Sequence, residues 1–340
     1  MRAHRRSAAA GALLVALAVT VLSGCTAPPA PPATPSATAA GACPDGVAVT
    51  TTAELSAALE ASEPGQTIVL AAGRYDAPIT IDRSGTADSP LTLCGPADAV
   101  LAGGSTDTGY TLHLDGASHW RLTGFSVEGG QKGVMLDGSS SNVLAGIRVS
   151  NTGDEAVHLR GGSSDNRLEG LTVRTTGLRE AQFGEGVYIG TAESNWCEVS
   201  SCAPDASDRN VVTGSDIAGT TAEAIDVKEG TTGGELSANT LDGSASTAVD
   251  SLIDVKGSGW TVSGNTGGGP RDGAQVHVVL DGWGAANRFS ANRFAVAADG
   301  YGVLVEGAAR SAGTIVLCDN VATVDGVSNP AFVSNVACTG

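Results

Sequence analysis

The segment Asn142-Val-Leu-Ala-Gly146 decides the fold, because close variants of it return along much of the chain. The variants are Asn166-Arg-Leu-Glu-Gly170, Asn210-Val-Val-Thr-Gly214, Trp260-Thr-Val-Ser-Gly264 and Asn287-Arg-Phe-Ser-Ala291. One such unit cannot bury its own apolar edges, whereas a stack of units can. The repeat therefore predicts a solenoid of stacked coils.

A second strand type alternates with the first at intervals of 23 to 38 residues. Its copies are Gly133-Val-Met-Leu136, Ala156-Val-His-Leu159, Gly186-Val-Tyr-Ile189, Ala224-Ile-Asp-Val227, Leu252-Ile-Asp-Val255, His277-Val-Val-Leu280 and Gly302-Val-Leu-Val305. Short strands whose apolar residues alternate with outward residues, repeated serially, predict an all-β protein formed by a single right-handed parallel β-helix. A propeller would need four antiparallel strands per blade and a more even period.

The start of the domain predicts a short capping helix. Residues 51–61 carry apolar residues at helical spacing, with Thr51 or Thr52 as the N-cap and Glu54 near the third helical position. Such a helix would close the open end of the stack, where an uncovered strand edge invites aggregation.

The N-terminus predicts export and lipid anchoring. Residues 1–24 combine a basic start with a short apolar run that ends in Leu22-Ser23-Gly24-Cys25. This ending resembles a bacterial lipobox, which implies lipidation of Cys25 and attachment to the outer face of the cell membrane. Residues 25–42 are rich in Pro, Ala and Thr and predict an extended tether, so that residues 43–340 form one domain.

The number of cysteines and the net charge limit the cellular environment and the kinds of partner that the protein can have. Six of the seven cysteines remain besides Cys25. In an exported chain this even number predicts disulfides, and their order suggests Cys43–Cys94, Cys197–Cys202 and Cys318–Cys338. Loss of residues 1–24 removes three arginines and no acid, so the formal charge falls from −17 to −20. This charge argues against a nucleic-acid partner. We expect a monomer.

The first coils carry a resemblance to a known family. The segments are Gly65-Gln-Thr-Ile-Val-Leu70, Gly73-Arg-Tyr75 and Gly85-Thr86-Ala-Asp-Ser-Pro90-Leu91. Over about 50 residues this opening resembles the N-terminal coils of β-helix polysaccharide lyases of the chondroitinase B and alginate lyase type. The resemblance implies the fold and superfamily rather than the catalytic residues.

Ionisable residues gather at outward positions of the second strand type. Aligned by their inward apolar pairs, the strands are expected to place these residues on one outer face, because stacked strands lie about 4.8 Å apart. The expected set is His158, Arg160, Tyr188, Asp226, Lys228, Asp254, Lys256 and Asp281. Two aromatic residues, Trp196 and Trp283, follow strands of this set and could flank the face as sugar-binding rings.

The strand Glu223-Ala-Ile-Asp-Val-Lys228 carries a second resemblance. In the lyases named above, a Glu-x-Ile-x-x-Lys strand supplies a calcium-ligating Glu and the catalytic base, which implies these roles for Glu223 and Lys228. The chain departs from that family at Lys256, where the family has Arg, and at Thr221, where it has a second acidic ligand. Glu185 or Asp226 could replace that ligand.

The implied reaction is β-elimination on an acidic polysaccharide that contains uronic acids. Calcium or cationic side chains would neutralise the uronate carboxylate, and Lys228 would take the C5 proton with its pKa lowered by Lys256 and Arg160. Tyr188 or His158 would pass a proton to the leaving oxygen. Asp226, Asp254 and Asp281 would bind substrate, although their charges oppose a lowered lysine pKa.

Two other functions fit the sequence. Asp226 and Asp254, one coil apart, could serve as the carboxylate pair of a glycoside hydrolase. Alternatively, an anchored β-helix could present a polysaccharide-binding face without turnover. Calcium dependence and unsaturated product ends distinguish a lyase from both.

Overall fold

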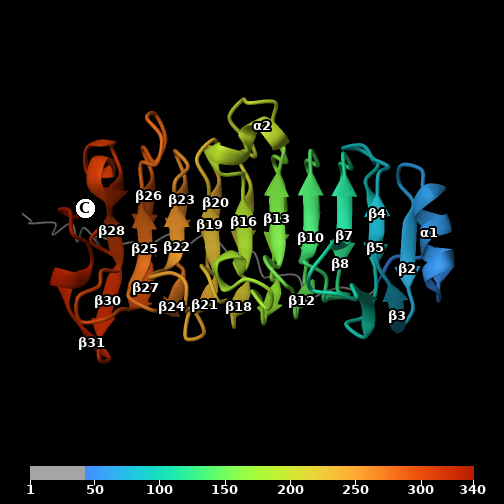
Figure 1. Cartoon of the computed structure of the whole chain (residues 1–340), viewed down its shortest axis with the longest axis horizontal. Coiled ribbons are helices and arrows are strands. Elements are labelled where there is room, and N and C mark those ends of the chain that lie inside the picture. The colour runs from blue at the N-terminus through green and yellow to red at the C-terminus, as the bar shows by residue number, and fades with distance from the viewer. Residues whose placement is uncertain (1–42) are drawn as a thin grey trace, which may run out of the picture. The chain divides into compact units, whose positions relative to one another are not determined.

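The computed structural model describes residues 43–340, which form a parallel β-helix of three sheets. The expected signal peptide (residues 1–24), the lipidation site at Cys25 and the tether (residues 25–42) lie outside the described residues. Nine complete coils each contribute one strand to each sheet, and successive coils follow one another from the N-terminal helix to the C-terminus (Figure 1). The right-handed parallel β-helix predicted from the repeats is confirmed.

Sheet A contains the strands of the Asn-x-Leu-x-Gly type. Its strands are β1 (Val47–Val49), β2 (Thr67–Leu70), β5 (Leu91–Cys94), β8 (Trp120–Thr123), β11 (Val143–Ala145), β14 (Arg167–Glu169), β17 (Val211–Thr213), β20 (Glu235–Ser237), β23 (Thr261–Ser263), β26 (Arg288–Ser290) and β29 (Ile315–Val316).

Sheet B follows sheet A in each coil after a tight turn. Its strands are β3 (Gly73–Asp76), β6 (Ala99–Ala102), β9 (Ser126–Glu128), β12 (Arg148–Ser150), β15 (Thr172–Arg174), β18 (Asp216–Ala218), β21 (Thr240–Asp242), β24 (Thr266–Gly268), β27 (Arg293–Ala295), β30 (Val321–Val324) and β31 (Val327–Ser328). Only β30 and β31, among the described strands, pair antiparallel.

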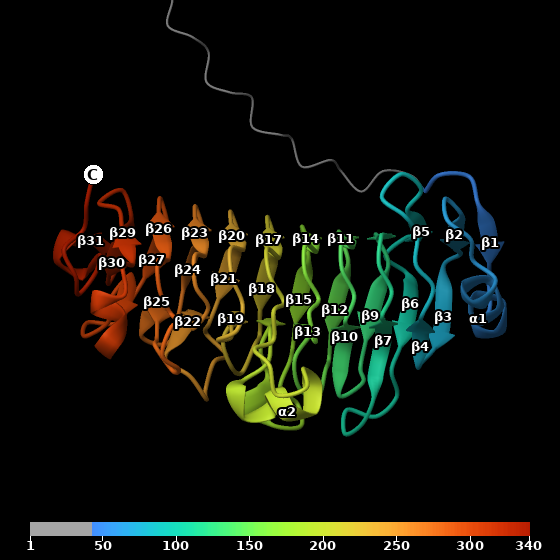
Figure 2. The ribbon, with the colours of Figure 1, turned by 90° about the horizontal axis from the view of Figure 1, so that it is seen from above.

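Sheet C carries the second strand type. Its strands are β4 (Ile79–Ile81), β7 (Tyr110–Asp115), β10 (Lys132–Asp137), β13 (Val157–Arg160), β16 (Val187–Ile189), β19 (Ile225–Val227), β22 (Ser251–Val255), β25 (Asp272–Val276) and β28 (Val303–Val305). Seen from above, the three sheets run side by side along the axis (Figure 2).

Alternation along each strand builds the core. Val157 and Leu159 point inward and are fully buried, and they stack on Val187 and Ile189 of the next coil. The same pattern recurs in every neighbouring coil of sheet C, so apolar side chains form continuous ladders inside the solenoid. Burial inside therefore fixes which residues of sheet C point outward.

Asparagine ladders hold the turns between strands. Each buried Asn amide accepts the backbone N–H of the preceding ladder residue and donates to a core-side carbonyl. One ladder joins Asn142, Asn166 and Asn210, and a second joins Asn239, Asn265, Asn292 and Asn320. These bonds satisfy backbone groups that the turns would otherwise leave buried and unpaired.

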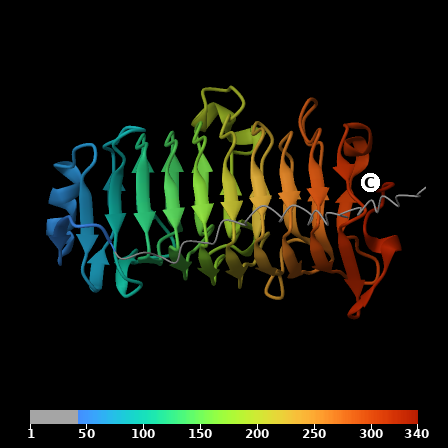
Figure 3. The same cartoon turned by 180° about the vertical axis from the view of Figure 1, so that it is seen from behind.

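The helix α1 (Thr52–Glu60) closes the N-terminal end, as predicted. Thr51 is its N-cap, and Thr51 and Glu54 form a reciprocal capping box. Leu55 and Leu59 bury the apolar side of α1 against the first coil. Figure 3 shows α1 from behind, at the opposite end from the C-terminus.

The remaining helices are short. The helix α2 (Trp196–Val199) projects from the side of the solenoid near its middle (Figures 1 and 2). Four 3₁₀ helices were found in residues 43–340: Ala181–Phe183, Glu193–Asn195, Gly307–Ser311 and Pro330–Phe332. No helix in this part of the chain has both the length and the apolar content needed to cross a membrane.

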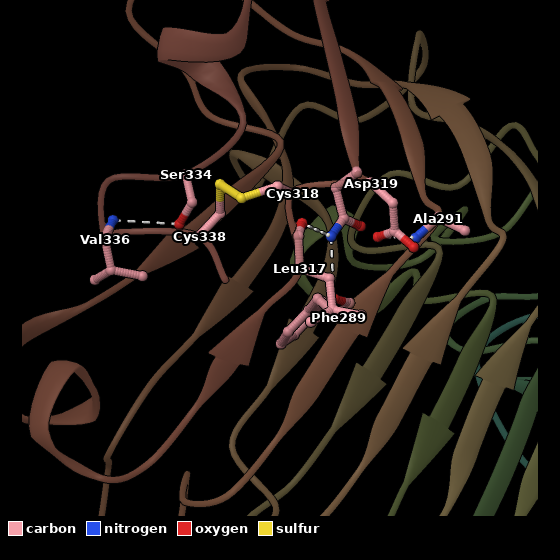
Figure 4. Close-up of a disulfide and its surroundings, with 9 residues drawn as sticks. Phe289, Ala291, Leu317, Cys318, Asp319, Ser334, Val336 and Cys338 are labelled. Carbon is pink, nitrogen blue, oxygen red and sulfur yellow. Dashed lines mark hydrogen bonds between the residues drawn. A yellow bond between two sulfur atoms is a disulfide. The ribbon is translucent and has the colours of Figure 1, made fainter. Parts of the chain in front are cut away.

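All three predicted disulfides are present. Cys43–Cys94 ties the start of the domain to β5, and Cys197–Cys202 closes the loop that carries α2. Cys318–Cys338 joins the last coil to the C-terminal segment (Figure 4). Beside this disulfide, the backbone N–H of Ala291 donates to Asp319, which links the last two coils.

Candidate active site

The outward residues of sheet C form three columns that cross its strands. Strand pairing fixes which residues share a column, and each coil supplies one row. The first column is Lys132, Glu155, Glu185, Glu223, Ser251 and Asp272; the middle column is Met135, His158, Tyr188, Asp226, Asp254 and Gln275; the third is Asp137, Arg160, Gly190, Lys228, Lys256 and His277. The expected concentration of ionisable residues on one face is therefore present.

Tyr188 lies at the centre of this face and packs on His158. The two rings meet edge to face with centroids 4.5 Å apart, and the Lys228 ammonium lies 4.8 Å from the centre of the Tyr188 ring. Burial raises the pKa of Tyr188 well above its usual value, and the charges of Asp226 and Glu185 add to the effect. Tyr188 therefore keeps its proton and can donate it.

His158 is a buried residue rather than an exposed proton donor. Its side chain is 7% exposed, and its Nε2–H donates to the Gly190 carbonyl at 3.0 Å. Its Nδ1 approaches Glu155 at 3.3 Å without the alignment of a hydrogen bond. Burial lowers the pKa of His158, so the ring is neutral. The geometry gives His158 the role of supporting Tyr188 and the strand end at Gly190, which corrects the expectation that it could protonate the leaving oxygen directly.

Two lysines share a buried carboxylate next to Tyr188. Lys228 lies 2.5 Å from one oxygen of Asp226, and Lys256 lies 2.8 Å from the other. Lys256 also lies 2.6 Å from Asp254. The lysine side chains are each 14% exposed, whereas that of Asp226 is 2% exposed. The ammonium groups therefore form the solvent-facing layer, with the carboxylates beneath them.

The pKa of Lys228 is raised, not lowered as the sequence suggested. Burial lowers the pKa, but the charge and hydrogen bond of Asp226 outweigh burial. Lys256 is affected in the same way by Asp226 and Asp254. For Asp254, burial raises the pKa, and Lys256 and His277 overcome this and lower it to about 2. Lys256 and Arg160 were expected to lower the pKa of Lys228. The aspartates raise it by more, because each lysine contacts a carboxylate directly.

Three carboxylates meet on the other side of Tyr188. Glu185, Glu223 and Asp226 each place an oxygen within 4.8 Å of the others, and all three are buried. One oxygen of Glu185 has no hydrogen-bond partner within the described residues. Burial raises the pKa of Glu185 well above its usual value, and that of Glu223 to about 7. Such a set needs protons or a metal ion to offset its charge, and its oxygen donors fit a hard divalent cation.

Arg160 is held at the end of the face toward the N-terminus. Its Nε donates to Asp137 at 2.5 Å, and its guanidinium reaches the Tyr110 hydroxyl at 3.2 Å. Asp137 also contacts His113 at 2.9 Å. Burial raises the pKa of Asp137, but the bonds from His113 and Arg160 reverse the shift and lower it to about 2. Arg160 is therefore a positioned cation two coils from Lys228.

The loop that carries α2 stands beside this part of the face. Asp205 anchors it, accepting hydrogen bonds from the backbone of Gly161 and Gly162 and from the Thr191 hydroxyl. An open cavity of about 360 Å³ lies between the loop and the strand ends, with Arg160 and Glu198 in its wall. A larger cavity of about 570 Å³ lies along the turns between sheets A and B and has Arg148 as its only charged lining residue. The former borders the third column at Arg160 and Asp137.

Two predicted residues occupy other positions than expected, and a third keeps its predicted role untested. Trp196 is 6% exposed and donates its indole N–H to Thr191, so it supports the loop and presents no ring to a sugar. Asp281 lies in the exposed turn after β25, because the strand is Asp272–Val276 rather than residues 277–280. Trp283, in the same turn, is half-buried, and its binding role stays a prediction.

The corrected register brings His277 into the site. Asp254 pairs with Gln275 and Val255 with Val276, so His277 follows Lys256 in the third column. Its Nδ1 lies 2.8 Å from Asp254. The sequence hid this alignment, since His277-Val-Val-Leu280 is more apolar than the true strand Asp272-Gly-Ala-Gln-Val276.

Comparison with solved structures identifies the class of protein. The alginate lyase of Paenibacillus sp. str. FPU-7 matches with a TM-score of 0.75 and 34% identity, over 83% of this chain and 96% of the lyase. Pectate lyase Pel9A matches with a TM-score of 0.57 and 14% identity, over 83% of this chain and 72% of that protein. The Streptococcus pneumoniae surface adhesin PfbA matches with a TM-score of 0.59 and 11% identity, over 81% and 80%. No family model and no curated protein matches the chain.

The fold and the first of these matches define a parallel β-helix polysaccharide lyase. The chain belongs to the same family as the Paenibacillus alginate lyase, since the identity extends over nearly all of that protein. At 14% and 11% identity, the pectate lyase and the adhesin show the fold alone. The predicted lyase is therefore confirmed in preference to the hydrolase and the non-catalytic binder.

Proposed function

We propose that this lyase cleaves a polyuronate, with alginate as the first substrate to test, by β-elimination on the outer face of sheet C. The observation that carries the proposal is the grouping of Tyr188 and Lys228 on adjacent coils, with the Lys228 ammonium 4.8 Å from the centre of the Tyr188 ring. The name of the Paenibacillus relative supports the choice of alginate.

Substrate binding would rely on cations that face solvent. Gly190 leaves the third column without a side chain between Arg160 and Lys228. A uronate unit lying over Tyr188 would thus have a guanidinium on one side and an ammonium on the other, each about one coil away. The charge of Arg160 would neutralise the carboxylate next to C5, which makes the C5 proton easier to remove.

Lys228 is the proposed general base. It would take the proton from C5, and the electrons of the broken C–H bond would form the double bond between C4 and C5. The bond from C4 to the glycosidic oxygen breaks, and the oxygen leaves with the electron pair of that bond. To act in this way Lys228 must first lose its own proton, so Asp226 and the surrounding carboxylates determine how much active base is present.

Tyr188 is the proposed general acid. Its phenol keeps its proton in the site and would transfer it to the departing oxygen, which balances the proton taken by Lys228. His158 supports the Tyr188 ring from below through the edge-to-face contact. Asp226 and Asp254 are bound to lysines and would position the cations rather than touch the sugar as free acids.

We assign Glu185, Glu223 and Asp226 as the ligands of a calcium ion. Calcium bound there would supply positive charge beside the substrate carboxylate. Its three protein ligands come from neighbouring coils, so the ion would also tie β16 to β19.

Export and anchoring complete the proposal. Three disulfides within residues 43–340 suit an oxidising environment outside the cytoplasm. Lipidation at Cys25 and a tether over residues 25–42 would hold the domain at the outer face of the cell membrane, where it acts as a monomer on an acidic polysaccharide.

A substrate panel tests the function. The purified domain is incubated with polymannuronate, polyguluronate and polygalacturonate, and ultraviolet absorbance follows the unsaturated uronate ends. We expect absorbance to rise with at least one alginate component and product masses to sum to that of the substrate. Products heavier by one water per cut would mean hydrolysis. A flat trace with every polymer would contradict the proposed substrate class.

A further inference from the structure

Four basic side chains lie along one edge of the active-site face. Arg160, Lys228, Lys256 and His277 occupy the third column, at the ends of β13, β19, β22 and β25. The proposed chemistry uses Arg160 and Lys228, and Lys256 contacts the Asp226 that also binds Lys228. His277 lies two coils beyond Lys228, away from Tyr188, and takes no part in that chemistry.

His277 is hydrogen-bonded through one ring nitrogen, and its other ring nitrogen makes no hydrogen bond within the described residues. Its Nδ1 bonds to Asp254 at 2.8 Å, and the ring is 30% exposed above a carboxylate that is 8% exposed. The hydrogen bond and charge of Asp254 raise the pKa of His277 against burial, with Lys256 opposing and Glu306 adding to the increase. The arrangement favours a protonated imidazole whose Nε2–H is available to a ligand.

The spacing of the column matches the repeat of a polyuronate. Stacked strands are about 4.8 Å apart, so His277 lies about 10 Å along the axis from Lys228. One sugar unit in an extended chain is about as long as one coil is high, and each uronate carries one carboxylate. A substrate lying parallel to the helix axis would therefore bring one uronate to Lys228 and the uronate two units further along to His277.

We propose that His277 forms a distal subsite that binds the carboxylate of a uronate two units from the unit that reacts at Lys228. This inference rests on the proposed function and adds a chain-length requirement to it. Asp254 positions the imidazole, and Lys256 occupies the coil between the reacting unit and the subsite. Substrates too short to span these coils gain nothing from His277.

The length dependence of cleavage tests the subsite. The kcat/KM values of a uronate dimer and a hexamer are measured for the wild type and for His277→Gln, which keeps a hydrogen-bonding side chain and removes the charge. Loss of a charge-assisted hydrogen bond is expected to lower the hexamer-to-dimer ratio about tenfold, mainly through KM. Arg293→Gln, on the outward side of β27 in sheet B, is the matched control and should leave the ratio unchanged.

The outcomes separate the subsite from the proposed function. If the wild type cleaves the hexamer but His277→Gln leaves the ratio unchanged, or lowers both rates equally, the subsite is wrong and the lyase assignment stands. If the wild type cleaves no uronate oligomer, the proposed substrate class fails. Equilibrium binding to Lys228→Ala gives a second measure without turnover, and the added His277→Gln change should weaken hexamer binding about tenfold.

Discussion

The Lys256 ammonium lies 2.8 Å from the Asp226 carboxylate of the preceding coil. Asp226 thus contacts two ammonium groups, since Lys228 approaches its other oxygen at 2.5 Å. If Lys228 loses its proton to act as a base, Asp226 keeps one cationic partner and is not left as an isolated buried charge, which would be costly. Lys256 therefore makes the neutral form of Lys228 compatible with a buried Asp226.

Removal of a proposed calcium ligand should shift the thermal unfolding midpoint, relative to the wild type, in opposite directions with and without calcium. Calcium should raise the thermal unfolding midpoint of the wild type, because binding to the folded state alone stabilises it. Glu185→Gln removes one of three crowded carboxylates, so without calcium it should unfold at a higher temperature than the wild type. With calcium, the variant should show little further increase. An equal calcium-dependent shift in both proteins would place the ion elsewhere.

Asp137 should make stability depend on acidic pH. Its folded pKa is lowered to about 2 from an ordinary value of 3.8, so the unfolded chain takes up the proton first as pH falls. The stabilisation is fully present above about pH 5 and is lost as pH falls toward 2. We expect Asp137→Asn to be less stable than the wild type at neutral pH and the difference to shrink below pH 4, as measured by denaturant unfolding. A difference independent of pH would contradict the ionic origin.

The asparagine ladder should contribute strongly to folding stability. Asn265 accepts from the backbone and side-chain N–H groups of Asn239 and donates to Leu236. Asn265→Ala leaves these buried groups without their partner, and we expect it to lower the free energy of unfolding by about 3 kcal/mol. Thr266→Ala changes the adjacent exposed residue and is the control. Similar losses in both variants would argue against a special role of the ladder.

Periodicity predicts the solenoid well and its register less well. The repeats of Asn, Leu and Gly follow directly from buried ladders, so the fold could be read from residues 142–146 and their copies. At β25 the inward residues are Ala274 and Val276, with Gly273 beside them, which gives a weak apolar signal. The more apolar residues 277–280 were therefore aligned as the strand. This misalignment put Asp281, instead of His277, in the expected site.

Alignment of the repeats within the chain also predicted which residues lie together, but it did not predict their exposure or charge state. Glu185, Glu223 and Asp226 do converge, since they come from neighbouring coils. The burial of Trp196 depends on how its loop folds back, which no repeat encodes. The raised pKa of Lys228 results from a short contact with Asp226 two residues earlier, which the pattern of alternation alone does not quantify.

The rate of unsaturated product formation by Lys228→Ala tests the central claim most directly. Initial rates on the preferred uronate polymer are compared among the wild type, Lys228→Ala and Tyr188→Phe, with Arg293→Gln as the folded control. Loss of a general base should lower kcat by about 10²–10⁴-fold, with substrate binding largely kept. In deuterated water Tyr188→Phe should still exchange the C5 proton, while Lys228→Ala should not. A Lys228→Ala variant that retains a rate within tenfold of the wild type would contradict Lys228 as the base.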